Sequence, residues 1–553
     1  IKSNIGHAQA AAGVAGVIKM VQALRHETLP RTLHAERPSE HVDWSAGQIE
    51  LLNSPQSWPA GDRPRRAGVS SFGISGTNAH VILEQTPSAE AESGAEEGQP
   101  LALGDTPLPF LLSARGEEAL QAQAARLRSQ LERGPEEQLG DLASALALDR
   151  AHLGDRAVVL ARGRGELIAA LAALENGEPV AGLVQGAARR EGKLAFLFTG
   201  QGGQRAGMGR ELYGAFPVFA AAFDSVCAEL DGQIGRSLKD LVFASRGSEE
   251  ALSLNRTEFT QPALFALEVA LYELVGSFGL VPDYLIGHSI GELAAAHVAG
   301  VLSLPDAAAL VAARGRLMGG LPAGGEMLAI QASEDEALRL LAAAEGRLAL
   351  GAVNAPGSVT VSGESEAIRE LEDEWRGRGR KTSRLAVSHA FHSHLIDPML
   401  EQFRQVAEGV SLAPPRLPIV SNVTGKLVGA ELTDPGYWVS QAREPVRFAA
   451  GIGTLERDGT TGFIELGPDA VLTASARECL AEQNGDETLF ASVLRAGRPE
   501  PEALLSALAQ AHAHGIELDW EAVLGPRRSQ RVRLPTYAFQ RRRYWLEPKA
   551  GKT

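Results

Sequence analysis

Short apolar runs that end at glycine or at a turn alternate with longer segments of helical periodicity along most of this chain. Uninterrupted apolar runs are typical of buried strands, and apolar residues three or four positions apart are typical of amphipathic helices. Strands are expected at residues 110–112, 157–160, 194–200, 284–286, 327–330 and 358–362. Helices are expected at residues 10–24, 116–132, 141–148, 165–175, 262–278, 293–301, 333–345 and 364–377. This alternation predicts an α/β architecture.

Both ends of the chain and one internal stretch depart from this alternation. Residues 67–83 form a glycine-punctuated segment that runs into an apolar strand at its end. Residues 87–100 contain no aliphatic side chain larger than alanine, so they cannot build a core and are expected to be a linker. After residue 490 comes a helical piece and then a tail with Arg541–Arg543 beside Tyr544 and Trp545. This basic cluster is expected to be a solvated or docking surface.

Composition narrows the classes of function. The 553 residues are enough for three or more domains, and the net charge of −15 argues against a nucleic-acid-binding protein, which usually carries a basic excess. Cys227 and Cys479 are the only cysteines, which excludes a disulfide framework and fits a reducing cytosol. No apolar run reaches the roughly 18 residues of a membrane span, and neither a signal peptide nor an initiator methionine opens the chain. We expect a cytoplasmic piece of a longer protein, with no membrane and no nucleic-acid partner.

A candidate nucleophile lies between the strand at 284–286 and the helix at 293–301. Residues 287–292 read Gly-His-Ser-Ile-Gly-Glu, and a Gly-x-Ser-x-Gly run between a strand and a helix is typical of a nucleophile elbow. The glycines permit a tight turn, and backbone N–H groups at the helix N-terminus can stabilise an oxyanion. Ser289 is therefore the expected nucleophile.

A serine nucleophile needs a base, and three histidines lie within residues 388–394, Ser-His-Ala-Phe-His-Ser-His. A metal site is the competing interpretation, but no cysteine and no second cluster of histidine or glutamate completes one. Residues 200–204, Gly-Gln-Gly-Gly-Gln, lack the Lys-Ser/Thr of a phosphate-binding loop, yet such a loop can offer N–H groups to an oxyanion. Arg314, on an otherwise apolar helix, belongs either to a structural ion pair or to a clamp for an anion.

Together these segments resemble the malonyl-CoA:acyl-carrier-protein transacylase family and, more closely, the acyltransferase domain of modular type I polyketide synthases. Four segments resemble successive acyltransferase motifs: FTGQGGQRAGMG, GHSIGELAAAHVAG, ARGRLM and HAFHSH. The C-terminal end of a β-ketoacyl synthase is resembled by IKSNIGHAQAAAG and GVSSFGISGTNAHVILE, and its linker to the acyltransferase by residues 110–190. LPTYAFQRRRYWLE resembles the tail that follows the acyltransferase and packs back on the ketosynthase.

The resemblance implies roles for particular residues. Ser289 matches the acylated nucleophile, His392 the general base, and Arg314 the arginine that binds the free carboxylate of a malonyl group. Further matches are the backbone N–H groups of Gln201 and Ile290 for an oxyanion hole, Gln441 near the catalytic histidine, His389, Ala390 and Phe391 for the choice of extender unit, and Lys2 and His7 for ketosynthase residues. Malonyl-loading domains resemble HAFH before and at the catalytic histidine and methylmalonyl-loading ones YASH, so the resemblance favours malonyl.

The resemblance also implies a domain order. The expected parts are a C-terminal ketosynthase fragment with a partial thiolase-like fold (1–86), a small α/β linker domain (87–192), an acyltransferase domain with an α/β-hydrolase-like core (193–490), a ferredoxin-like subdomain inserted in it (about 326–388), and a post-acyltransferase linker (491–553). The ketosynthase part contains no cysteine nucleophile, so we expect it to be inactive alone.

The implied activity is transfer of malonyl from malonyl-CoA, through an ester on Ser289, to the phosphopantetheine thiol of an acyl carrier protein. The chain is expected to bind no cofactor and no metal, because the phosphopantetheine belongs to the carrier protein. The remaining ketosynthase part of the same polypeptide is the other expected partner. The alternative is a hydrolase of the thioesterase or α/β-hydrolase kind, which also combines Gly-x-Ser-x-Gly with a later histidine. Arg314 and the loop at 200–204 favour transfer over hydrolysis.

Overall fold

The computed structural model describes residues 1–86, 106–134, 138–188, 192–385, 387, 389–481, 488–525 and 532–543. The chain divides into two compact units, Ile1–Glu97 and Gly98–Thr553, and each is described by itself. The linker expected at residues 87–100 lies outside the described residues, as do Tyr544 and Trp545 of the tail. No helix in the described ranges is long and apolar enough to cross a membrane.

The described residues of the first unit, 1–86, form two helices and two pairs of antiparallel strands. Its elements are α1 (Lys2–Ile5), α2 (Ala11–Arg25), β1 (Thr28–Leu29), β2 (Gln56–Ser57), β3 (Arg66–Phe72) and β4 (Asn78–Glu84). The segment at 67–83 is therefore a hairpin, and its first half is a strand as well as its second. This is possible because its glycines lie in the turn and at a single position of β3. Large apolar side chains such as Ile18, Phe72 and Ile82 are exposed in this unit, so its elements enclose little core of their own.

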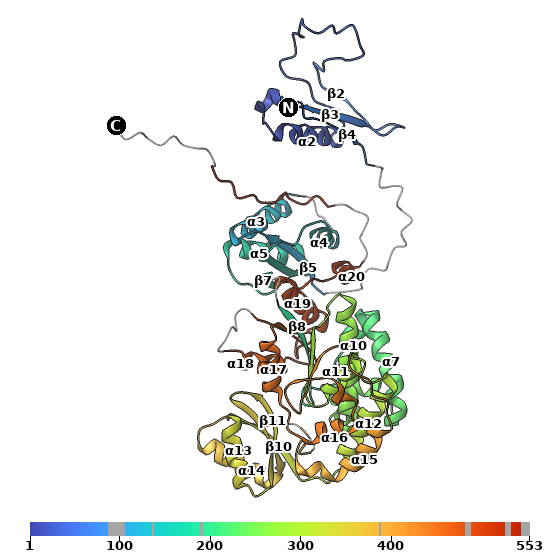
Figure 1. Cartoon of the computed structure of the whole chain (residues 1–553), viewed down its shortest axis with the longest axis vertical. Helices are drawn as coiled ribbons and strands as arrows, with labels where there is room; N and C mark the ends of the chain where they lie inside the picture. Colours follow the sequence, from blue (N-terminus) through green and yellow to red (C-terminus); the bar gives the residue numbers. More distant parts are fainter. Residues whose placement is uncertain are drawn as a thin grey trace, which may run out of the picture. The chain divides into compact units, whose positions relative to one another are not determined.

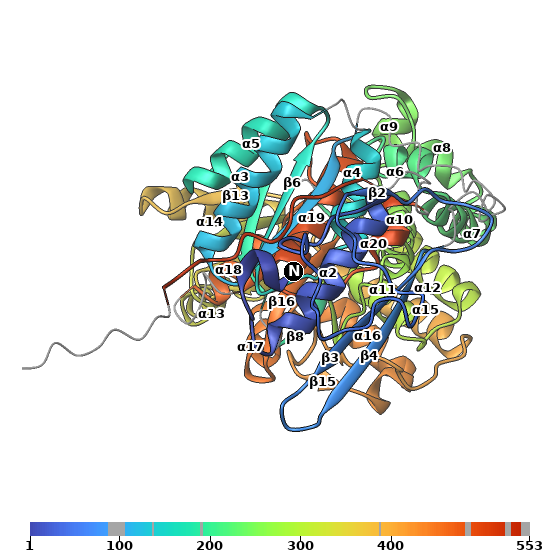
Figure 2. The same ribbon diagram turned by 90° about the horizontal axis from the view of Figure 1, so that it is seen from above.

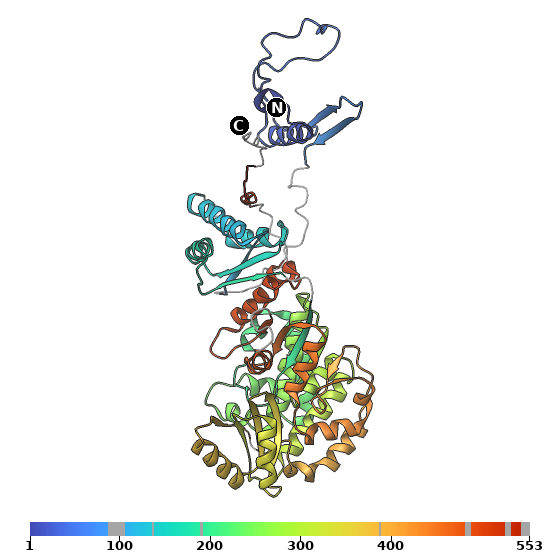
Figure 3. The same ribbon diagram turned by 60° about the vertical axis from the view of Figure 1, so that its left-hand side comes forward.

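The second unit begins with a small module built on a three-stranded antiparallel sheet. Its strands are β5 (Leu108–Ala114), β6 (Asp155–Ala161) and β7 (Leu183–Ala187), and its helices are α3 (Glu117–Arg133), α4 (Leu139–Leu148) and α5 (Arg164–Asn176). Figures 2 and 3 show α3 and α5 lying side by side against this sheet, and their buried leucines and alanines fill a core with the inner face of β5 and β6.

The main domain is organised around a six-stranded sheet in the order β15-β14-β9-β8-β16-β17. Its strands are β8 (Lys193–Phe198), β9 (Tyr284–Gly287), β14 (Ile419–Val420), β15 (Leu427–Val428), β16 (Thr460–Leu466) and β17 (Leu489–Ser492). All neighbours are parallel except β14 and β15. The carboxyl ends of the parallel strands therefore meet at one edge, where α/β sheets usually place their functional residues.

Helices cover both faces of this sheet (Figure 1). They are α6 (Arg210–Ala215), α7 (Pro217–Ile234), α8 (Leu238–Val242), α9 (Glu249–Ser253), α10 (Thr257–Ser277), α11 (Gly291–Val298), α12 (Leu304–Gly319), α15 (Asp397–Glu408), α16 (Pro435–Arg443), α17 (Phe448–Arg457) and α18 (Leu472–Cys479). The helix expected to start at Pro262 instead begins at Thr257, with the proline inside it. Its residues from Phe259 to Leu271 are all buried, and this packing outweighs the helix-breaking preference of proline.

In the insertion after α12, strands and helices follow one another in the order of a ferredoxin-like subdomain. Its elements are β10 (Gly325–Ile330), α13 (Glu334–Ala343), β11 (Leu348–Ala355), β12 (Ser358–Glu364), α14 (Ser365–Gly377) and β13 (Thr382–Arg384), and its antiparallel sheet has the order β11-β12-β10-β13. Two strands, β11 and β13, were not predicted. Half of the eight residues of the first strand are alanine or glycine, which have low strand propensity, and the second has only three residues, two of them exposed.

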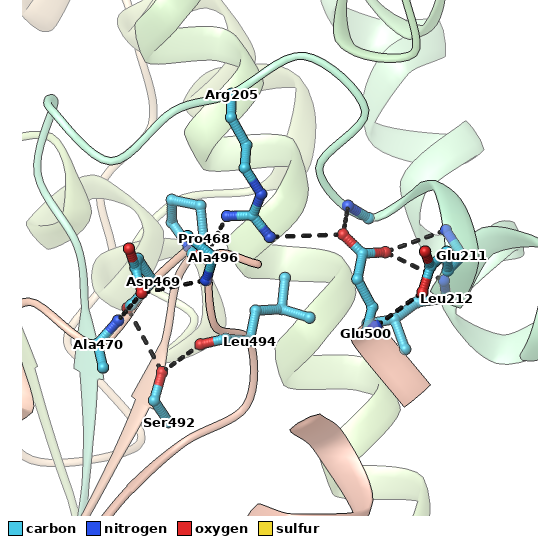
Figure 4. Close-up of polar contacts among 11 residues, drawn as sticks. Arg205, Glu211, Leu212, Pro468, Asp469, Ala470, Ser492, Leu494, Ala496 and Glu500 are labelled. Carbon is cyan, nitrogen blue, oxygen red and sulfur yellow. Dashed lines mark hydrogen bonds and ion pairs between the residues drawn. The ribbon is translucent and has the colours of Figure 1, made fainter. Parts of the chain in front are cut away.

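Helix α19 (Glu500–Ala513) follows the main sheet, and its first residue ties it to the core (Figure 4). The buried carboxylate of Glu500 accepts backbone N–H groups of Gly209, Glu211 and Leu212 at 2.7, 3.0 and 3.3 Å. It thus binds the N-terminus of α6, where a negative charge meets unpaired N–H groups and the helix dipole. Arg205 lies 3.6 Å from the same carboxylate.

The described part of the tail, residues 532–543, runs along the small module. Arg126 Nη1 donates to the carbonyl oxygens of Thr536 and Tyr537, at 3.0 and 2.9 Å, and Arg150 Nη2 donates to that of Pro535 at 2.8 Å. Helix α20 (Trp520–Leu524) precedes the tail and packs near α19, with Trp520 buried.

Candidate active site

Ser289 lies in a sharp turn between β9 and α11, at the carboxyl edge of the main sheet. Its φ of +53° falls in the left-handed region, which a non-glycine residue rarely adopts. The flanking positions have to be glycine because a side chain would collide with the neighbouring backbone. A Cβ on Gly287 would lie 2.1 Å from the Glu292 nitrogen, and one on Gly291 would lie 2.3 Å from the Phe198 oxygen. The predicted strand–turn–helix context of the elbow is therefore present, and Ser289 itself is half-buried.

His392 is the histidine that contacts this serine. Its Nε2 lies 2.8 Å from Ser289 Oγ, and its Nδ1 lies 2.8 Å from the carbonyl oxygen of Glu444. Because a carbonyl only accepts, Nδ1 carries the proton and Nε2 is free to accept the hydroxyl proton. His389 instead directs Nε2 to the carbonyl oxygen of Leu321 at 3.0 Å, and His394 lies in a short 3₁₀ turn, His394–Ile396.

The surroundings of His392 hold it in the neutral form. Burial, together with the positive charge of Arg314 and the neighbouring His288, lowers the pKa of its imidazole to about 3. The ring is 3% exposed. A neutral imidazole is the form that accepts a proton, so the site is prepared for base catalysis across the neutral pH range.

Arg314 reaches the serine from α12. Its Nη2 donates to Ser289 Oγ at 3.1 Å, and the residue is 1% exposed. Burial lowers the pKa of the guanidinium to about 10, and the carboxylate of Glu292 counteracts this effect. Within the described ranges, no carboxylate lies within 4.0 Å of Arg314, and its Nε has no hydrogen-bond partner. Of the two roles expected for Arg314, the structural ion pair is therefore not formed among the described residues.

The glycine-rich loop after β8 lies against the elbow. A Cβ on Gly200 would lie 2.8 Å from Nδ1 of His288, which places the loop beside the serine turn. The side chain of Gln201 donates to Thr257 Oγ1 at 3.4 Å, and Ile290 is buried as the first residue before α11. In the part of the chain that the structure describes, the backbone N–H groups of Gln201 and Ile290 have no hydrogen-bond partner.

Gln441, on α16, also contacts the elbow. Its Nε2 donates to the carbonyl oxygen of Ser289 at 2.7 Å. The residues expected to select the extender unit lie just before the base: Ala390 and Phe391 are buried, at 1% and 6% exposure. A Cβ on Gly325 would lie 2.7 Å from that of Ala390, so this segment packs tightly against the start of β10.

The structure adds residues that the sequence did not single out. Asn422, after β14, bonds both Ser289 N–H and the Gly287 carbonyl, and His288 Nε2 lies 2.9 Å from Asn354 Oδ1. Glu292 is completely buried and accepts the hydroxyl of Tyr437 and the Asn422 backbone N–H. Burial raises the pKa of Glu292 to about 7. The only local signal for Asn422 was its place as the second of two polar residues after a short apolar run.

Two of the expected residues lie elsewhere. Lys2 and His7 are exposed in the first unit, which contains none of the residues around Ser289, and His7 Nδ1 accepts the backbone N–H of Gln9 at 3.0 Å. Among the described residues, no group of three or more histidine, cysteine, aspartate or glutamate side chains is arranged to hold a metal ion.

A serine on a strand–helix elbow, a neutral histidine and a buried arginine define a site for acyl transfer on an α/β core. The family model described as "Acyl transferase domain" matches residues 195–518, and the chain belongs to this family. Models of the β-ketoacyl synthase C-terminal domain and of the ketoacyl-synthetase C-terminal extension match residues 1–36 and 38–160.

The relatives show which kind of enzyme carries these parts. The chain is 51% identical over 553 residues to polyketide synthase GfsA of Streptomyces halstedii, covering 100% of this chain and 7% of that protein. It is 50% identical over 547 residues to the spectinabilin polyketide synthase system protein NorB of Streptomyces orinoci, covering 98% of this chain and 25% of that protein. The chain thus spans a quarter or less of these two relatives.

Solved structures agree. The acyltransferase domain from the second module of the salinomycin polyketide synthase is 54% identical, with a TM-score of 0.64, over 77% of this chain and 98% of that one. The acyltransferase domain of SpnD is 36% identical, with a TM-score of 0.66, over 75% and 97%. The chain therefore carries a modular polyketide synthase acyltransferase domain, preceded by the C-terminal end of a ketosynthase and its extension. The predicted fold class and family are confirmed.

Proposed function

We propose that this domain takes malonyl from malonyl-CoA as an ester on Ser289 and passes it to the phosphopantetheine thiol of an acyl carrier protein. The observation that supports this most is the buried guanidinium of Arg314, 3.1 Å from the serine hydroxyl and without an ion-pair partner among the described residues. A buried charge without a partner is unfavourable, so a substrate carboxylate that pairs with it binds strongly. A malonyl thioester presents such a carboxylate two bonds beyond the carbonyl that Ser289 attacks.

In the first half-reaction, His392 Nε2 takes the hydroxyl proton as Ser289 Oγ attacks the thioester carbonyl carbon. The resulting oxyanion is stabilised by the N–H groups of Gln201 and Ile290. The carbon–sulfur bond then breaks, and His392 returns the proton to the departing thiolate of coenzyme A. The product is a malonyl ester on Ser289 and free coenzyme A.

In the second half-reaction, the carrier thiol gives its proton to His392 and attacks the ester. The carbon–oxygen bond to Ser289 breaks, and the serine oxygen takes the proton back from His392. The hydrogen bond from Nδ1 to the Glu444 carbonyl keeps the imidazole in one orientation through both transfers. Each half-reaction uses the same base, which gives a ping-pong mechanism.

The substrate carboxylate also supports the base. The charge of Arg314 is one cause of the lowered pKa of His392, second to burial. A carboxylate paired with Arg314 offsets that charge and makes the imidazolium easier to form. A neutral acyl group such as acetyl offers no such compensation. The proposal thus assigns the malonyl carboxylate a role in proton transfer as well as in binding.

Malonyl is proposed over methylmalonyl because of the segment before His392. Phe391 is buried immediately beside the base, and its phenyl ring would occupy space that an α-methyl group needs. His389 is fixed to the Leu321 carbonyl, which helps to hold the segment in place. The SpnD domain, solved in complex with a 2-(pent-4-yn-1-yl)malonyl group, supports a malonyl-type substrate for this fold but shows a substituted one.

Intact-mass measurement tests the proposal. The chain is mixed with malonyl-CoA, with and without a carrier protein bearing phosphopantetheine, and the mass of each protein is followed. We expect one malonyl group on the chain, absent from Ser289→Ala, and its passage to the carrier protein. Release of free malonate faster than carrier loading would instead favour the hydrolase alternative, in which water replaces the thiol.

A further inference from the structure

Asn422 holds the nucleophile turn by both ends. Its Oδ1 accepts the backbone N–H of Ser289 at 2.6 Å, and its Nδ2 donates to the carbonyl oxygen of Gly287 at 2.6 Å. The orientation of the amide is unambiguous, because an N–H can only donate and a carbonyl can only accept. The side chain is 3% exposed, so water does not compete for either bond.

Strand register explains how Asn422 reaches the turn from 133 residues away. Strand β14 pairs in parallel with β9, with Ile419 opposite Leu285 and Val420 opposite Ile286. Two residues further along, Asn422 therefore lies beside the residues that form the turn. Its own backbone is fixed as well: its N–H donates to Glu292 Oε1 at 3.2 Å, and its carbonyl accepts from Arg447 N–H at 2.8 Å.

The turn needs such support, since Ser289 has a φ of +53°. Non-glycine residues in this region persist only where the surrounding structure determines them. The bond from Asn422 has a second consequence: it occupies the Ser289 N–H, so this group is not available to a developing oxyanion. The N–H groups of Gln201 and Ile290 remain.

We propose that Asn422 is a positioning residue, which holds Ser289 in its strained conformation in line with His392 and reserves the oxyanion site for Gln201 and Ile290. This inference rests on the proposed acylation of Ser289. The effect on the reaction runs through the serine, since the side-chain amide of Asn422 bonds the backbone groups of Ser289 and Gly287 and no reacting atom. A displacement of about 1 Å at a reacting atom lowers rates by about 10²-fold.

Asn422→Asp separates positioning from packing, because the two side chains have nearly the same shape. A protonated aspartate accepts from Ser289 N–H and donates to the Gly287 carbonyl, as asparagine does. An ionised aspartate places a second acceptor against that carbonyl and breaks the bond. The acylation rate of this variant should therefore rise relative to wild type as the pH falls.

Other ionisable groups around Asn422 are shared by wild type and variant, so the ratio of their rates isolates the new carboxyl. They are Glu292 on α11, Tyr437 on α16, Arg314 on α12, His288 in the turn and His392 beside it. Asn176→Asp, at the exposed end of α5, is the matched control and should follow wild type at every pH.

The experiment measures the rate of malonyl-mass gain on the chain between pH 5.5 and 8.5, together with the thermal midpoint of each variant. We expect Asn422→Asp to lose on the order of 10²-fold at pH 8.5 and to recover much of it at pH 5.5, and Asn422→Ala to be slow at every pH. A pH-independent ratio for Asn422→Asp, or wild-type rates in a folded Asn422→Ala, overturns the inference. If wild type itself gains no malonyl mass, the proposed function fails instead.

Discussion

His392 directs Nδ1 to the carbonyl oxygen of Glu444, 2.8 Å away, where a serine protease would place a carboxylate. A carbonyl fixes the tautomer and orientation of the ring as an aspartate does, but it brings no negative charge to stabilise the imidazolium. Burial and Arg314 keep the pKa of His392 low. Under the proposed function, the negative charge that assists the base is the malonyl carboxylate, which links the choice of substrate to the chemistry of the dyad.

Replacing the base tests the dyad. His392→Ala should slow the acylation of Ser289 by about 10²–10⁴-fold, the usual contribution of general-base catalysis. His389→Ala and His394→Ala are the matched controls and should cost less, since His392 is the histidine whose Nε2 lies 2.8 Å from Ser289 Oγ, whereas Nε2 of His389 lies 3.0 Å from the Leu321 carbonyl oxygen. Rapid-quench measurement of malonyl-mass gain compares the three. A larger loss for His394→Ala would show that the base has been misassigned.

Replacing the arginine tests substrate recognition. Arg314→Ala removes charge-assisted hydrogen bonds, each worth roughly 1.5–3 kcal/mol, and should lower kcat/KM for malonyl-CoA by at least tenfold. The acetyl group of acetyl-CoA has no carboxylate that could pair with Arg314, so its transfer should change little. The preference for malonyl over acetyl should therefore become smaller. Arg316→Ala, two residues along the same helix, serves as control. Unchanged malonyl kinetics in the folded Arg314→Ala variant would leave Arg314 with a structural role only.

The three central side chains could be predicted from the sequence because each lies in a local pattern: an elbow around Ser289, a histidine cluster around His392, an apolar helix around Arg314. Their proximity followed from the family resemblance alone. Asn422 and Glu444 could not be predicted. The contacts of Asn422 depend on strand register, and that of Glu444 uses its backbone carbonyl, so residue type alone does not indicate either role. Strand β11 was not predicted for a related reason: its alanines and glycine have low strand propensity, and they form a strand here because they pair with neighbouring residues.

The junction between α19 and the small module should be sensitive to acid. His512 is 1% exposed, with Nδ1 accepting the Trp520 indole N–H at 3.3 Å and its ring 4.7 Å from that of His152. Burial, together with the charges of Arg156 and His152, lowers the pKa of His512 to about 3. Burial also lowers the pKa of His152. The unfolded chain therefore binds protons below about pH 6.5 that the folded chain does not.

The stability that neutral His512 contributes is thus complete above pH 6.5 and is lost progressively as the pH falls towards 3. Its share of the loss between pH 7 and 5 is about 2 kcal/mol in the free energy of unfolding. His512→Gln keeps an acceptor for Trp520 but cannot titrate, so urea unfolding should show a smaller loss over this range. His514→Gln, at the half-buried residue directly after this helix, is the matched control and leaves His512 in place. Equal pH dependence in all three proteins would rule His512 out as its source.

Extender selection should favour malonyl, but not absolutely. Under the proposed function, Phe391 occupies the space beside His392 that an α-methyl group would need, and a single methyl group in an apolar pocket is worth about 1–3 kcal/mol. Competition between equal malonyl-CoA and methylmalonyl-CoA, read as the mass of the acyl group on Ser289, should therefore give a preference of tens- to hundreds-fold. Replacing His389-Ala390-Phe391 by Tyr-Ala-Ser should relax this preference without cleanly reversing it, because Ala390, which the replacement keeps, still packs closely against the start of β10. A predominance of the methylmalonyl adduct in the wild-type protein would contradict the malonyl assignment while leaving the acyltransferase chemistry intact.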